Sequence, residues 1–133
     1  STIEKILVKK GATLSSKYPF KQEKLIIEAK TNGNISLELF AEKLNTKISL
    51  GGRVCLNGKV DTHKLEINTS SICEAEKLNT KKTILISKAG AFAYINSKTS
   101  LEAKIYGGVI REFGNPEEKN IENRLGGKIY IEK

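Results

Sequence analysis

The residues of this sequence best suited to chemistry are two cysteines, one histidine and one aspartate. Cys55 and Cys73 are 18 residues apart, a spacing that invites a disulfide bond or a pair of metal ligands. His63 is the only histidine, and Asp61 the only aspartate. One histidine and one aspartate so close together do not make a Ser-His-Asp arrangement, and a zinc site needs further ligands. We therefore predict no catalytic residues, no cofactor, no metal site and no enzymatic activity.

The remaining acidic residues are all glutamates. Four of them recur at similar intervals, with Lys47 and Leu85 filling the gaps: Glu28, Glu66, Glu102 and Glu122. Paired carboxylates are the groups that hydrolyse glycosides. A solvated face in which lysines lie between glutamates is the preferred interpretation, and a carbohydrate-active site is the alternative.

A repeat of about nineteen residues must position all these side chains. Six small-residue pairs are each followed by an apolar residue, and these apolar residues lie 19, 19, 19, 18 and 19 positions apart. They are Ile35, Val54, Cys73, Phe92, Ile110 and Ile129. Apolar and polar residues alternate on both sides of each pair, as in strands with one buried face. A period of this length predicts a solenoid whose turns share one core.

We predict an all-β fold, a single-stranded right-handed parallel β-helix of about six to seven turns of about 19 residues. Equivalent residues of successive turns then stack about 4.8 Å apart. The six apolar residues above form an inward column, so Cys73 points inward and Cys55 outward as two free thiols. His63 is expected to be solvated at the start of a strand. The small-residue pairs mark a sharp corner that needs glycine.

The repeat leaves no boundary between domains. We predict one β-helix domain over residues 1–133, with an irregular first turn and a capping loop in 1–23 and regular repeats in 24–133. The capping loop is expected over residues 17–23. Residues 115–118 are predicted to form a turn, because the apolar period of a helix is missing there.

The net charge of +8 comes almost entirely from lysine. There is no arginine cluster and no aromatic-basic alternation, so we predict no nucleic-acid partner. A lysine-rich surface also discourages sheet edges from pairing with other molecules. No stretch approaches the roughly 20 apolar residues of a transmembrane helix, so none is predicted in this chain.

An apolar strip is predicted on the outer face after the corner in the later turns. Its residues are Ile72, Ala91, Ala93, Ile95, Val109, Phe113 and Tyr130. Such a strip is unusual in contact with water. We interpret it as a surface for self-association or for a partner.

The iterated Gly-Gly-x-Ile/Val units resemble the head GIN domain family of auto-transporter-like adhesins from Bacteroidetes. The most specific part is Gly107-Gly108-Val109-Ile110, Gly114-Asn115-Pro116 and Leu125-Gly126-Gly127-Lys128-Ile129. The pattern departs from the family at Ser70-Ser71 and Ala89-Gly90. The resemblance implies an exported protein of the cell envelope, periplasmic or on the cell surface and often lipid-anchored in its precursor.

Three hypotheses for function follow. The first is a non-enzymatic adhesion or scaffold module of the cell envelope that contacts a cell-surface protein or glycan. The second is a glycan-binding or carbohydrate-active β-helix protein, and the third is a self-associating structural module that forms homo-oligomers. Fold alone does not decide among them.

Overall fold

The computed structural model describes residues 3–132 and contains eleven strands and no helix in that range. Ser1, Thr2 and Lys133, the outermost residues of the predicted domain, lie outside the described residues. No helix that could span a membrane occurs between residues 3 and 132. In chain order the strands are β1 (Ile3–Lys9), β2 (Thr13–Ser15), β3 (Phe20–Lys30), β4 (Asn34–Ser49), β5 (Arg53–Ile67), β6 (Ile72–Lys88), β7 (Phe92–Ile95), β8 (Ser97–Tyr106), β9 (Val109–Glu112), β10 (Glu118–Asn123) and β11 (Lys128–Ile131).

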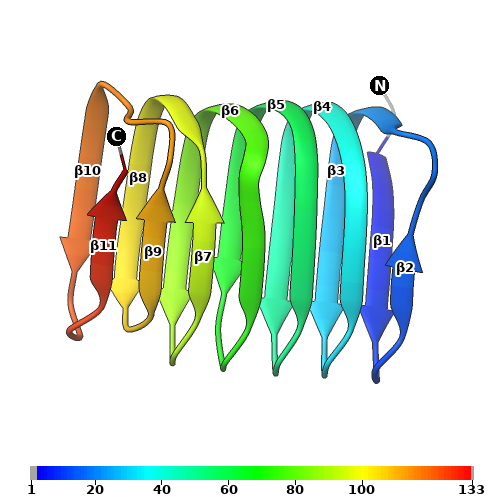
Figure 1. Cartoon of the computed structure of the whole chain (residues 1–133), viewed down its shortest axis with the longest axis horizontal. Coiled ribbons are helices and arrows are strands. Elements are labelled where there is room, and N and C mark those ends of the chain that lie inside the picture. The colour runs from blue at the N-terminus through cyan, green and yellow to red at the C-terminus, as the bar shows by residue number, and fades with distance from the viewer. Residues whose placement is uncertain (1–2, 133) are drawn as a thin grey trace.

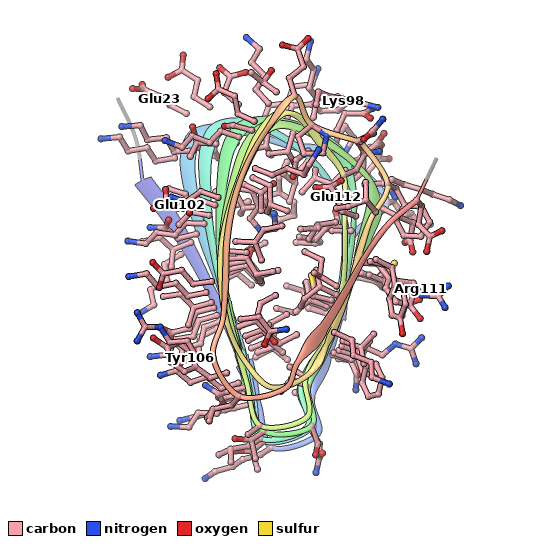
Figure 2. The ribbon with its side chains drawn as sticks, turned by 90° about the vertical axis from the view of Figure 1, so that its left-hand side faces the viewer. Glu23, Lys98, Glu102, Tyr106, Arg111 and Glu112 are labelled. Atoms are coloured by element: carbon pink, nitrogen blue, oxygen red, sulfur yellow. The ribbon has the colours of Figure 1, made fainter. Side chains whose placement is uncertain are left out.

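The strands wind into a flattened coil with two walls (Figure 1). Wall A consists of β2, β7, β9, β11 and the first halves of β4, β5 and β6, and wall B of β1, β8, β10, most of β3 and the second halves of β4, β5 and β6. The chain rises along wall A, crosses a rounded arch and descends wall B to a tight corner (Figure 2). Viewed along its axis this winding is right-handed.

Every strand pairing in the sheet is parallel, which confirms the predicted solenoid. Each strand therefore lies about 4.8 Å from its counterpart in the next turn. Inward side chains from both walls fill the interior with Leu, Ile, Val and Ala. The narrow core needs no large aromatic side chain, consistent with a sequence that has no Trp.

Glycine occupies two kinds of position at the tight corner in most turns. Gly51 has a φ of +79°, a conformation that residues with a side chain rarely adopt. Gly52 lies so close to the preceding turn that an added Cβ would meet the carbonyl oxygen of Ala29 at 2.8 Å. Ser71 and Ala91 occupy the place of Gly52 in the next two turns.

The inward column of wall A differs from the prediction in one turn. It runs through Ile35, Val54, Cys73, Ala93, Ile110 and Ile129. Phe92, expected in this column, is 45% exposed on the outer face. The reason is a bulge in β6 between Glu74 and Lys77, which lengthens this turn so that Ile72 pairs with Phe92, 20 residues further on. The following turn is short, because Phe92 pairs with Val109, only 17 residues on. The long and short turns cancel, so the average period conceals the shift.

The first turn is more regular than expected. β1 and β2 pair with β3 and β4 along their whole length. The predicted capping loop over 17–23 is shorter, because β3 begins at Phe20 and Phe20–Gln22 pairs with Leu39–Ala41.

Candidate functional site

The two cysteines lie where the sequence predicts them. Cys73 is buried in the core, whereas Cys55 is half-buried on the outer face, in register with Ser36 and Glu74. Both are free thiols. Burial raises the pKa of the Cys73 thiol, so this group stays protonated and serves as an apolar packing group.

His63 is buried, so the prediction of a solvated histidine is wrong. Its position in β5 is aligned with the inward residues Leu44 and Thr83 of the neighbouring turns. A hydrogen bond of 2.9 Å joins its Nε2 to Oγ1 of Thr46, which gives the buried ring a polar partner. Desolvation by burial lowers the pKa of His63 to about 4, so the ring is neutral at neutral pH.

This buried histidine predicts a loss of stability in mild acid. The unfolded chain takes up a proton near pH 6.5, whereas folded His63 does so only near pH 4. The contribution of neutral His63 to the free energy of unfolding is therefore fully present above pH 6.5. It decreases as the pH falls between these values, by about 2 kcal/mol from pH 7 to pH 5. Urea denaturation at the two pH values measures the loss. A His63→Leu variant should lose most of this dependence; an unchanged dependence would assign it to other groups.

Asp61 and Glu66 have ordinary surface partners. Oδ1 of Asp61 lies 3.6 Å from Nζ of Lys81, and Oε2 of Glu66 lies 3.6 Å from Nζ of Lys47. The predicted glutamate column is wrong in two places because of the β6 shift: Glu102 belongs to the adjacent column, and Leu85 is buried. The observed column reads Leu7, Glu28, Lys47, Glu66, Ile86, Lys104 and Glu122.

The predicted apolar strip is partly wrong. Ala91, Ala93 and Ile95 are fully buried, because the shift in β6 turns this set of alternating residues inward. Ile72, Val109, Phe113 and Tyr130 do lie on the outer face of wall A. The same shift turns Phe92 and Tyr94 outward beside them.

We call the resulting surface the aromatic face. It consists of Ile72, Phe92, Tyr94, Val109, Arg111, Phe113 and Tyr130. Four of the chain's eight Phe and Tyr residues lie here. Phe92, Phe113 and Tyr130 are 45%, 39% and 46% exposed. The aromatic face thus concentrates exposed aromatic area on the C-terminal turns of one wall.

Ring and cation contacts order the aromatic face. Tyr94 and Phe113 meet edge to face, with centroids 6.1 Å apart and an interplanar angle of 70°. The Arg111 guanidinium carbon lies 5.8 Å from the centroid of the Tyr130 ring, and Nη1 of Arg111 lies 3.9 Å from Oε1 of Glu132. Arg111 points outward from wall A in Figure 2. Phe, Tyr and Arg ordered in this way are the residue types enriched in protein interfaces.

A buried carboxyl group supports the aromatic face from beneath. Glu112, between the outward residues Arg111 and Phe113, points inward and is fully buried (Figure 2). Its Oε1 and Oε2 accept hydrogen bonds of 3.1 and 2.9 Å from the Ser97 N–H, and Oε2 accepts one of 2.6 Å from the Gly114 N–H. These bonds join the end of β9 to the start of β8 at Ser97 and to the following residue Gly114.

Sequence reasoning misses Phe92 and Tyr94 because they depend on the register of β7. It misses Arg111, in β9, because a strip defined by apolar residues leaves out a charged side chain. It also misses Glu112, since a glutamate in an alternating strand is normally assigned to the outer face. The sequence does contain one indication: Glu112 is two residues after Ile110, and alternate residues of a strand share a face, so Glu112 falls on the inward side of β9.

Known proteins resemble this chain in sequence and in fold. The sequence profile of the family described as "Putative auto-transporter adhesin, head GIN domain" matches residues 1–116. A solved structure described as a putative adhesin from Bacteroides fragilis NCTC 9343 superposes with a TM-score of 0.83 at 25% sequence identity. The superposition covers 88% of this chain and 55% of the solved one, so this chain spans about half that relative's length. No curated protein matches the chain.

Proposed function

Since the chain belongs to the "Putative auto-transporter adhesin, head GIN domain" family, we propose that it is a non-enzymatic adhesion module of the cell envelope whose aromatic face contacts a protein partner. The observation that carries this proposal is the concentration of exposed Phe92, Phe113 and Tyr130 on one rigid wall. Burial of such aromatic side chains supplies much of the binding energy of protein interfaces.

The build of the solenoid supports an adhesive role. Continuous parallel strands pair through the coil, so the aromatic face needs little ordering when it binds. The buried Glu112 holds β9 and the arch in place behind it. The family description supports a location in the cell envelope.

We assign no catalytic role to His63 or Asp61. His63 is enclosed in the core and neutral, and Asp61 is ion-paired with Lys81 at the arch. Of the two side chains only Asp61 is accessible to solvent, so they cannot act together on one substrate.

Removal of two exposed aromatic side chains is expected to weaken adhesion at least about tenfold, because each contributes buried apolar area at a protein interface. The variant is Phe92→Thr/Tyr130→Thr, in which threonine keeps the preference for a strand. The measurement is binding of the purified protein to intact cells of the source organism over a concentration series. Binding should also be lost when the cells are first treated with protease.

The matched control is Leu7→Thr/Phe40→Thr, which removes two apolar side chains of similar exposure outside the aromatic face. Its binding should equal that of the unaltered protein. Equal losses in both variants, or binding that survives protease treatment of the cells, would contradict a protein contact through the aromatic face.

Self-association through the same face is an alternative outcome. Light scattering over a concentration series, repeated at high salt, would reveal it. A concentration-independent monomer agrees with an external partner, whereas a salt-insensitive dimer that Phe92→Thr/Tyr130→Thr converts to monomer would replace the external partner by a second copy.

A further inference from the structure

The positive charge of the protein is concentrated on one outer face. We call it the basic face, and it comprises the outward positions of wall B in residues 5–9, 24–30, 43–49, 62–67 and 82–88. These segments contain nine lysines and two glutamates, which leave a formal charge of +7 where the whole chain carries +8. All nine lysines alternate with inward core residues and therefore project from the same side.

The neighbouring surfaces do not share this charge. On wall A the same turns, in residues 13–15, 34–41, 53–60 and 72–80, contain three basic and three acidic residues. On wall B the last two turns, β8 and β10, contain three lysines and three glutamates. Lysines that only keep a protein in solution do not need to be gathered on one face. The concentration of lysines on the basic face therefore indicates a further role.

Most lysines of the basic face lack an acidic partner. The Lys47–Glu66 contact at 3.6 Å is the ion pair that this face shows within residues 3–132. Lys24 lies directly beside Lys43 in the next turn, and Lys9 lies beside Lys30. Like charges stacked about 4.8 Å apart on parallel strands repel each other. An anionic ligand lying along the coil axis would relieve this repulsion.

A shallow furrow crosses the basic face. Two depressions of about 280 and 260 Å³ meet at Ile26 and Asn45, and between them they are bordered by Lys24, Lys43 and Lys64. The larger one is also bordered by Lys47 and by two acidic residues, Glu28 and Glu66, and Glu66 is paired with Lys47. Ile26 offers a small apolar surface, the exposed amide of Asn45 offers both a donor and an acceptor, and the lysines offer charge. A sugar ring that bears an acidic group has the complementary parts: an apolar ring face, hydroxyl groups and an anion.

We infer that the basic face binds an acidic polysaccharide, whose carboxylate or sulfate groups contact Lys24, Lys43 and Lys64 while a sugar ring lies over Ile26 beside Asn45. Nucleic acid fits this face less well, because the segments that form it contain no arginine and no aromatic residue on which bases could stack. A lipid surface fits less well, because it would not use the amide in the furrow.

This inference does not depend on the aromatic face, which lies on the other wall of the coil. The experiment measures binding to polygalacturonate and to dextran sulfate, with neutral dextran as the reference, at about 0.15 M salt. Lys24→Gln/Lys43→Gln/Lys64→Gln should raise Kd for an acidic polysaccharide at least about tenfold. Asn45→Ala, which leaves the charge unchanged, should raise it several-fold. Phe92→Thr/Tyr130→Thr should leave it unchanged.

The matched control is Lys21→Gln/Lys59→Gln/Lys77→Gln, which removes the same charge from the region of wall A and the arch. It should change Kd less than about threefold, since charges far from the ligand are screened at this salt concentration. If the control variant raised Kd as much as the Lys24/Lys43/Lys64 variant, the binding would depend only on net charge, and the inference would be overturned. Absence of binding to both acidic polysaccharides would overturn it, as would equally tight binding of single-stranded DNA or phosphatidylglycerol vesicles through the same three lysines.

Discussion

Glu112→Ala is expected to lower the free energy of unfolding by roughly 3–5 kcal/mol. Both oxygens of the Glu112 carboxyl group accept hydrogen bonds from the backbone, at Ser97 and Gly114. Alanine would leave these two N–H groups without their acceptor beneath a tightly packed wall, and would leave a cavity beside them. Urea denaturation of the purified variant measures the change.

Two further variants separate the acceptor role from the size of the side chain. Glu112→Gln keeps one oxygen acceptor and nearly the same volume, so it should lose clearly less stability than Glu112→Ala. Glu132→Ala removes a glutamate that is only partly buried and should cost less than about 1 kcal/mol. If Glu112→Ala were no more destabilising than Glu132→Ala, the claim that the buried carboxyl group stabilises the fold would be wrong.

Gly58→Ala is expected to cost at least about 3 kcal/mol, for two reasons that act together. Gly58 has a φ of +121°, which residues with a side chain rarely adopt. An added Cβ would also lie 1.9 Å from the carbonyl oxygen of Leu39 in the preceding turn. Because that oxygen belongs to a paired backbone, the two turns would have to move apart. Thermal and urea denaturation would both show the loss.

Gly126→Ala is the matched control for the conformational part of this cost. Gly126 has a φ of +70°, but an added Cβ would meet nothing within 4 Å. This variant should cost only about 1–2 kcal/mol, the penalty of a side chain in the left-handed region. Equal losses at the two positions would show that the close approach at Gly58 does not matter.

The sequence predicts the solenoid well because two independent patterns show the repeat: the glycines at the corners, and the alternation of apolar and polar residues in the strands. Each turn buries its inward residues against the next, so Val54 and Cys73 must face the same way if the turns stack. The inward position of Cys73 and the outward position of Cys55 follow from that rule alone.

The register of the later turns could not be predicted because both faces of β7 are apolar. Ala91, Ala93 and Ile95 alternate with Phe92 and Tyr94, so hydrophobicity favours neither set for the core. The structure buries the first set, whose side chains include two alanines that fit between stacked turns. The bulge in β6 has no proline or glycine to mark it, and the aromatic face was therefore only partly anticipated.

Buried polar residues are the second gap between sequence and structure. His63 and Glu112 look like surface residues, and each is buried because a specific partner from another turn satisfies it. Thr46 lies 17 residues from His63, and Ser97 lies 15 residues from Glu112. Such partners can be identified only when it is known which residue of one turn lies beside which residue of the next.

The most direct test of the proposed adhesive contact is photo-crosslinking on intact cells. Tyr130 and Phe40, both exposed, would each be replaced in separate variants by p-benzoylphenylalanine. If the aromatic face contacts a protein partner, Tyr130→p-benzoylphenylalanine gives a discrete cross-linked product that disappears when the cells are first treated with protease, and Phe40→p-benzoylphenylalanine gives none above background. Equal cross-linking from both positions, or products formed only between copies of this chain, would contradict the account.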